Sequence, residues 1–230
     1  MKRRLVIGAT LAALCAAVLP GVGGAANECR GIPVCISVPG PWVVVPAAAA
    51  AEAHYLLECP RRRGVVGGVD ALATSRAVRV SFDGRIGSPV SPGTTTTRDA
   101  FFRAVSSRRA VAAFQPYLGC IPAGGGGSRS TTAVVVTHPG VPVEHRATTV
   151  KLTGRVTRTV TQRCARNERL VDSWHALAFR TAAPPPLSAA AIVKLERRVV
   201  NGTVTLRVLT SEGLPASLHA EVQVGAVCAP

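Results

Sequence analysis

The 230-residue chain has few aromatic side chains, few acidic ones and, beyond its N-terminal segment, no long apolar run. Tryptophan, tyrosine and phenylalanine make up 4% of the residues, which leaves few platforms on which nucleic-acid bases could stack. No later stretch is apolar for the roughly 20 residues that a membrane-spanning helix needs. The 12 acidic residues form no cluster of the kind that binds calcium. These absences argue against nucleic-acid binding, later membrane spans and a calcium site.

Motifs of catalysis and metal binding are also missing. The chain has no G-x-S-x-G turn, and its five histidines lack chelating spacing. Nucleophile, base and acid occur together in Asp172-Ser173-Trp174-His175, but on a strand Asp172 points away from the side chains of Ser173 and His175. We therefore expect no metal, no cofactor and no local catalytic triad. The alternative is a hydrolase in which His175 meets an acid brought in by the fold.

The first 26 residues have the composition of a secretory signal peptide. Three basic residues precede an apolar run of about 15 residues from Leu5 to Leu19, and small residues follow as far as Ala26. We expect cleavage after Ala26, and a retained anchor is the alternative. Cys15 lies inside the run, where the bulky Leu14 before it disfavours lipid attachment. These features predict a secreted or envelope-associated protein.

Two segments of the chain resemble each other around their cysteines. CPRRRGVVGGVDALA from Cys59 aligns without a gap with CARNERLVDSWHALA from Cys164, and Cys120 and Cys228 each follow a glutamine by five residues. This internal repeat predicts two copies of one module. Six cysteines remain after signal removal and allow 15 pairings, but equivalent cysteines should close equivalent loops. The predicted disulfides are Cys59–Cys120, Cys164–Cys228 and Cys29–Cys35.

Short strands dominate the predicted secondary structure. The clearest signal is a hairpin of Ala191–Val200 and Thr203–Thr210, joined by Asn201-Gly202, a dipeptide that suits a type I′ turn. Its inward set is predicted to be Val193, Leu195 and Arg197. Helix propensity is high at Ala47–Tyr55 alone among the longer stretches. The pattern therefore predicts a mainly β protein.

A glycine-rich stretch at residues 124–130 has the composition of a flexible linker. We predict two tandem β-sandwich-like or small-barrel modules, residues 27–123 and 131–230, each pinned by a disulfide. The cysteine start, the Val-Val-Gly-Gly strand and the closing cysteine resemble the Cys-bracketed β modules of uncharacterised exported proteins from GC-rich bacteria. This resemblance implies a β fold and an exported location, and it brings no catalytic residues. The second copy departs from the pattern, since Asp172 and Ser173 replace the two glycines.

Arginine supplies most of the positive charge. Without the signal peptide, 24 lysines and arginines face 12 acids, a net charge of +12 that attracts anionic polymers outside the cell. An arginine group follows the first cysteine of each copy and could bind phosphate or carboxylate, the alternative being a solvated turn. The candidate ligand-binding residues are Arg61, Arg62, Arg63, Arg166, Arg169 and His175.

These observations predict an exported, non-enzymatic protein that binds a partner or an anionic polymer at or outside the cell envelope. Wall polymer and acidic polysaccharide are favoured over nucleic acid because aromatic side chains are scarce. Two alternatives remain, namely a secreted hydrolase with a site near His175 and a passive structural component.

Overall fold

The computed structural model describes residues 26–32, 34–48, 51–60, 64–83, 98–122, 143–211, 213–215 and 217–230. The N-terminal half contains β1 (Ile36–Pro39), β2 (Trp42–Val45), β3 (Glu52–Glu58), β4 (Val65–Ala73), β5 (Val78–Asp83), β6 (Asp99–Ser106) and β7 (Ala112–Ile121). The C-terminal half contains β8 (Glu144–Leu152), β9 (Thr157–Arg163), β10 (Arg169–Phe179), the short helix η1 (Leu187–Ile192), β11 (Val193–Val200), β12 (Thr203–Thr210) and β13 (Ala220–Ala229). The predicted mainly β class is confirmed.

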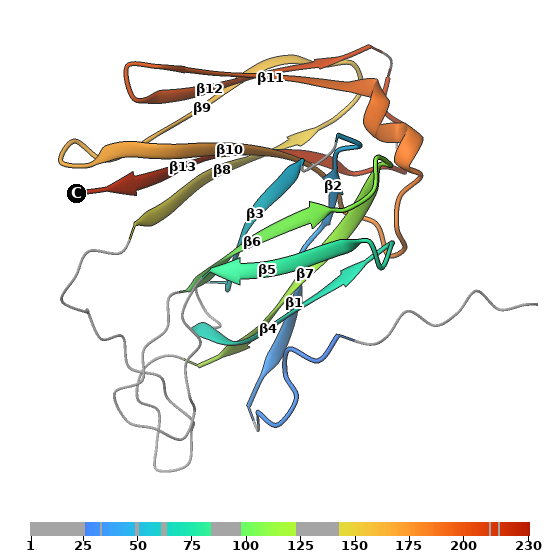
Figure 1. The fold of residues 1–230 in the computed structure, drawn as a ribbon, viewed down its shortest axis with the longest axis vertical. Helices are drawn as coiled ribbons and strands as arrows, with labels where there is room; N and C mark the ends of the chain where they lie inside the picture. The colour runs from blue at the N-terminus through green and yellow to red at the C-terminus, as the bar shows by residue number, and fades with distance from the viewer. Residues whose placement is uncertain are drawn as a thin grey trace, which may run out of the picture.

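One antiparallel sheet runs through both halves (Figure 1). Within it, β7 pairs with β4 along one edge and with β1 and then β2 along the other. β2 also pairs with β10, where Val43 lies opposite Ala178 and Trp42 lies opposite Phe179. The sheet continues from β10 through β13 to β8. The two halves are thus joined by backbone pairing.

A separate three-stranded sheet packs on each half of the shared sheet. Its strand order is β3-β6-β5 in the N-terminal half and β9-β12-β11 in the C-terminal half. Fully buried side chains fill the space between the layers, among them Phe102 and Phe114 in the first half and Phe179 and Leu206 in the second. The halves therefore repeat one order of strand pairing, while the shared sheet joins them. Their description as two separate modules stays a prediction, and the predicted linker lies outside the described residues.

The strand register corrects the ungapped alignment of the two cysteine segments by one residue. In β4, Val66 pairs with Cys120 and a bulge follows; in β10, Leu170 pairs with Cys228 and a bulge follows. Val66 comes seven positions after the first cysteine of its half, whereas Leu170 comes six positions after Cys164. The connection is one residue shorter in the second half, and equivalent positions along β4 and β10 are displaced accordingly.

All three predicted disulfides are present. Cys29–Cys35, Cys59–Cys120 and Cys164–Cys228 have Cα separations of 5.5, 5.8 and 5.6 Å. Those distances lie in the range that an unstrained bridge requires. In each half the long-range bridge links the end of the three-stranded sheet to the last strand of the shared sheet, because the first cysteine directly follows β3 or β9. The two layers of each half are therefore covalently tied.

Buried polar side chains join the two halves where the edge strand β3 meets β13. The side-chain amide of Gln223 accepts a hydrogen bond from Leu56 N–H (2.8 Å) and donates one to Leu56 C=O (3.0 Å). It thereby pairs the backbone N–H and C=O groups of an edge strand, as a neighbouring strand would. Beside it, the buried Glu221 accepts from the Tyr55 hydroxyl at 2.7 Å and forms an ion pair with Arg180 at 2.8 Å. The junction is built from specific contacts.

The predicted hairpin is confirmed, and the helix propensity of Ala47–Tyr55 is not realised in its described residues. β11 and β12 pair around Asn201 and Gly202, whose φ angles of 49° and 70° fit a type I′ turn. Of the predicted inward set, Val193 is buried and Leu195 is partly buried against the second core, whereas Arg197 is exposed and donates to Ser173 C=O of β10. Its residues from Glu52 onward belong to β3, because Ala53 and the alternate side chains after it are buried in the first core. Tertiary packing outweighs helix propensity there.

Candidate functional site

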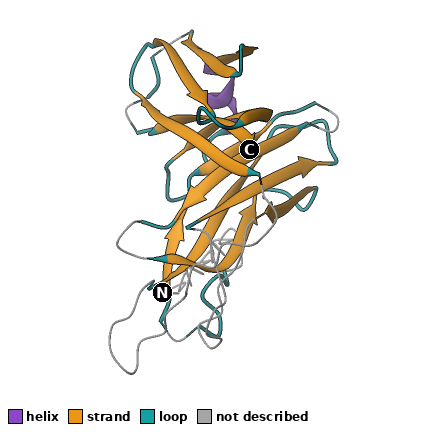
Figure 2. Cartoon of the chain, turned by 90° about the vertical axis from the view of Figure 1, so that its left-hand side faces the viewer, coloured by secondary structure: helices purple, strands orange, loops and turns teal. Residues whose placement is uncertain are grey.

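His175 lies on β10 in the wall of a pocket between the two halves. The pocket has a volume of about 580 Å³ and opens where β2 and β10 separate beyond their paired residues. The helix η1 (purple in Figure 2) forms part of its wall in the C-terminal half. Most lining side chains are apolar, among them Val44, Ala53, Leu177, Ala190, Val193 and Leu195. The pocket suits an apolar ligand better than a charged one.

No acid of the described residues is bonded to the imidazole of His175, and Glu52, which lines the same pocket, pairs with His54 and Arg103 instead. Burial lowers its pKa, and the positive charge of Arg197 lowers it further, so the ring is neutral at physiological pH. Ser173 shares the face of His175, but the Asp172 carboxylate accepts from the Ser173 N–H at 2.7 Å. In the part of the chain that the structure describes, no carboxylate hydrogen-bonds to His175. A serine hydrolase would need such a group within reach.

The corrected register also changes the counterpart of His175 in the other half. His175 pairs with Val224, directly after Gln223, just as Ala71 pairs with the residue after Gln115. The ungapped alignment had placed it opposite Asp70. His175 therefore replaces a small apolar residue whose side chain packs on the first core. A polar ring at this position is a property of the C-terminal half.

The predicted arginine group is partly described. Arg61, Arg62 and Arg63 lie outside the described residues, whereas Arg166 and Arg169 are exposed on and just after the turn that follows Cys164. No ion pair to either arginine occurs among the residues that the structure places. These two guanidinium groups are open to solvent beside the C-terminal disulfide.

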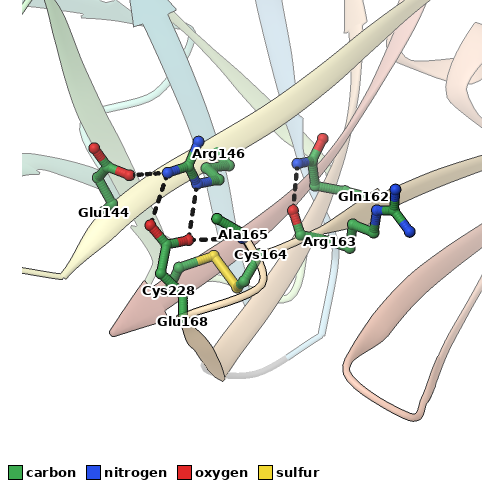
Figure 3. Close-up of a disulfide and its surroundings, with 8 residues drawn as sticks. All are labelled: Glu144, Arg146, Gln162, Arg163, Cys164, Ala165, Glu168 and Cys228. Carbon is green, nitrogen blue, oxygen red and sulfur yellow. Dashed lines mark hydrogen bonds and ion pairs between the residues drawn. A yellow bond between two sulfur atoms is a disulfide. The ribbon is translucent and has the colours of Figure 1, made fainter. Parts of the chain in front are cut away.

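A neighbouring arginine in the same region is held by carboxylates (Figure 3). Arg146 donates to the Glu168 carboxylate at 2.8 Å and also pairs with Glu144. The same Glu168 carboxylate accepts from the Ala165 N–H at 2.8 Å, which fixes the turn after the disulfide. Arg146 lowers the pKa of Glu168, while Glu168 raises the pKa of Arg146. This group is a structural clamp.

One set of possible metal ligands lies at the same place. Cys164, Glu168 and Cys228 bring their ligand atoms within 4.8 Å of one another. Both sulfur atoms are bonded to each other, so neither is a thiolate, and the carboxylate is bound to Arg146. The group cannot act as a chelate while the disulfide is intact.

Two histidines take part in a ring cluster between the halves. His145 of β8 stacks on Phe101 of β6 with ring centroids 4.1 Å apart, and His54 lies on the same ring at 5.2 Å. Trp174 meets Phe101 edge-on at 4.6 Å. Burial lowers the pKa of both histidines. The cluster packs β3 and β6 against β8 and β10, and a catalytic role is not needed to explain it.

The outer face of β9-β12-β11 forms a cationic surface that the sequence analysis missed. Side-chain alternation along each strand and the register between strands place mostly threonines and basic residues on this face. Its threonines are Thr157, Thr159, Thr161, Thr203 and Thr205, and its cations are Arg163, Lys194, Arg198 and Arg207. Two apolar residues, Val200 and Leu209, lie on the same face at the two ends of the sheet. We call this set the Thr/cation face. In Figure 1 the sheet lies at the top of the molecule, with no described element above it.

One acid, Glu196, lies on the Thr/cation face. It pairs with Lys194 at 3.0 Å and approaches Arg207 at 3.9 Å, and these cations lower its pKa. Arg198 and Arg163 make no ion pair in the described structure and are exposed. The face is therefore net positive, and the exposed Arg166 lies on the turn that follows β9 at the Arg163 end.

The sequence does contain a signal for this face. Thr-x-Thr alternation occurs in both Val156–Cys164 and Thr203–Thr210, two segments that the sequence predicts as strands. Which residues share a face depends on the pairing of β12 with β9 as well as with β11. Alternation within one strand could not reveal that.

Comparison with known proteins gives no further guide to the chemistry. Among the described residues, no helix has both the length and the apolar character to cross a membrane. The chain matches no protein-family model, no curated protein and no solved structure.

Proposed function

We propose that the protein is an exported, non-enzymatic binding protein that holds an anionic polymer on the Thr/cation face. The observation that carries the proposal is the composition of that face, which presents four cations and five threonines but one carboxylate on an uncovered sheet. Exposed surfaces of soluble proteins normally intersperse the two signs of charge. A surface with one sign draws in oppositely charged ligands.

The spacing of the face suits a repeating anion. Neighbouring strands of a sheet lie about 4.8 Å apart, and side chains on one face recur about every 7 Å along a strand. Guanidinium groups bind phosphate, sulfate or carboxylate through two parallel hydrogen bonds, and threonine hydroxyls supply further donors. The face has no aromatic residue. It therefore favours a wall polymer or an acidic polysaccharide over single-stranded nucleic acid, which needs stacking platforms.

Export is part of the proposal. Three disulfides are stable in an oxidising compartment, and the first 26 residues have the composition of a secretory signal. An anionic polymer of the envelope would meet the protein there. The disulfide Cys164–Cys228 lies beside the Arg163 end of the face, where it holds β9 against β13.

The test is retention of the refolded, disulfide-intact protein on columns of polyglycerol phosphate and of heparin at increasing salt. Arg198→Glu/Arg207→Glu should elute at markedly lower salt than the parent protein, because charge-led binding is screened by ions. The matched control is Arg76→Glu/Arg79→Glu, which changes the net charge equally at exposed positions of the N-terminal half. Equal loss in both variants, or no retention of the parent at low salt, would refute the proposal.

A second candidate function uses the pocket at His175. Its apolar lining and volume of about 580 Å³ favour a small uncharged ligand with one hydrogen-bonding group, which the neutral imidazole could bind. Fluorescence of an apolar dye should rise with the parent protein and fall when Ala190→Trp fills the pocket. Hydrolysis at His175 is a further alternative, and a His175→Gln variant that keeps full esterase activity would eliminate it.

A further inference from the structure

The start of the described chain lies against the outer face of the shared sheet. The Cys29–Cys35 disulfide closes this segment, and Glu28 within it is buried, with 6% of its surface exposed. A Cβ atom on Gly68 or on Gly119 would overlap the Glu28 carbonyl oxygen. These two glycines, paired across β4 and β7, therefore make room for the segment.

The described part of the C-terminal half has no such arrangement. The positions equivalent to the glycine pair, directly after the bulge of β10, are Asp172 and Val227. Both carry side chains that would exclude a crossing backbone. Among the described residues the glycine pair is thus specific to the half that receives the N-terminal segment, where the missing side chains allow the close approach of its backbone.

Two carboxylates, those of Glu28 and Asp70, lie at this segment without a basic side chain paired to them in the described structure. The backbone nitrogen of Asn27 donates to the Asp70 carboxylate at 2.6 Å. The Oε2 atom of Glu28 is buried and has no hydrogen-bond partner among the residues that the structure describes. Burial raises the pKa of the nearby Tyr117, and the charges of Glu28 and Asp70 raise it further. No lysine, arginine or histidine of the described chain forms an ion pair with either carboxylate.

We propose that the peptide bond between Ala26 and Asn27 is hydrolysed and that the new α-ammonium group of Asn27 is a structural cation bound to Asp70. A separate signal-cleaving peptidase adds water across the bond. Ala26 leaves with the carboxylate, and the nitrogen of Asn27 keeps its hydrogen and gains two protons. A neutral amide with one donor becomes a positive group with three, at the place where the two carboxylates need a counter-charge.

The mature protein should therefore be more stable than a chain with a blocked N-terminus. Pairing with Asp70 raises the pKa of the α-amino group in the folded state above its value in the unfolded chain. Such a group stabilises the fold below its unfolded pKa, and that contribution disappears as the pH rises through the folded pKa. Each unit of pKa shift changes the unfolding equilibrium constant tenfold.

The experiment has two parts. Intact-mass measurement of the exported protein should give a chain that begins at Asn27, and any other start overturns the proposal. Urea unfolding then compares the disulfide-intact chain from Asn27 with its Nα-acetylated form. At pH 6 the free amine should make the unfolding constant about tenfold smaller, and above pH 10 the two forms should converge. Equal stability at pH 6 would also overturn the proposal.

A charge variant separates the ion pair from general effects of acetylation. In Asp70→Asn the advantage of the free amine at pH 6 should vanish, whereas in Asp172→Asn it should persist, because Asp172 occupies the equivalent strand of the other half. If Asp70→Asn does not fold, NMR titration of the parent protein gives the same answer. A raised pKa of the Asn27 α-amino group supports the pairing, and an ordinary value refutes it.

Discussion

The junction between the halves can be tested at Gln223, whose side chain is 2% exposed. Its amide oxygen accepts from Leu56 N–H and from Trp174 Nε1, and its amide nitrogen donates to Leu56 C=O and to Thr149 Oγ1. Replacement by leucine keeps the approximate volume and removes all four hydrogen bonds. The perturbation therefore isolates polar contacts from packing.

The expected loss follows from the groups that are left behind. A buried donor or acceptor without a partner costs about 1–3 kcal/mol. Gln223→Leu leaves both backbone groups of Leu56 facing an apolar side chain, so the free energy of unfolding should fall by about 2–6 kcal/mol. The indole N–H of Trp174 adds to this if no water replaces the amide.

The equivalent glutamine of the N-terminal half supplies the matched control. Gln115 donates to Gly40 C=O and accepts from the Tyr117 hydroxyl, which is half-buried and can turn toward water. Gln115→Leu should therefore lose about 1–2 kcal/mol in urea unfolding followed by circular dichroism. A loss below about 1 kcal/mol for the Gln223 variant, or equal losses in both variants, would refute the bridging role of Gln223.

Two further predictions concern pH and turn geometry. Burial and the charges of Glu58 and Glu144 raise the pKa of Asp99 to about 6. The folded state thus binds this proton more tightly than the unfolded chain does. As the pH rises from about 4 to about 7, the free energy of unfolding should therefore fall by about 1–3 kcal/mol. Urea titrations at each pH should show a smaller decline in Asp99→Asn. Gly202→Val, at φ 70°, should lower the free energy of unfolding by about 1–2 kcal/mol, whereas Asn201→Gly, at φ 49°, should change it by less than about 0.5 kcal/mol. Equal melting temperatures for those two variants would contradict the turn assignment.

Local chemistry explains which features were predictable from the sequence. The Asn201-Gly202 turn was predictable because positive φ restricts the residues that fit. The long-range disulfides were predictable because duplicated cysteines must meet the same geometry in each half. In both cases few residue types meet the steric or covalent requirement, so the residues themselves indicate the structure.

Features that depend on pairing between distant strands were not predictable. The bulge after Leu170 shifts the register by one residue and leaves no mark in the composition of β10. Gln223 and Leu56 are 167 residues apart, and their contact requires a backbone edge that is visible only in the fold. The Thr/cation face was missed for the same reason, because the pairing of three strands brings its side chains together. The sequence pattern indicated the arginine turn instead.

The shared sheet has a consequence for folding that the predicted two-module description does not anticipate. If the halves were independent, loss of the Cys164–Cys228 bridge would destabilise the C-terminal half alone. Since β2 pairs with β10 and Gln223 satisfies the edge of β3, we expect Cys164→Ala/Cys228→Ala to lower the stability of both halves together, by about 2–5 kcal/mol. Native-state hydrogen exchange is the measurement, because it follows each strand separately. Amides of β5 and β6 in the N-terminal half should lose protection in step with those of β11 and β12. If β5 and β6 keep their full protection while β11 and β12 exchange freely, the junction does not couple the halves, and the contacts at Gln223 and Glu221 contribute little to stability.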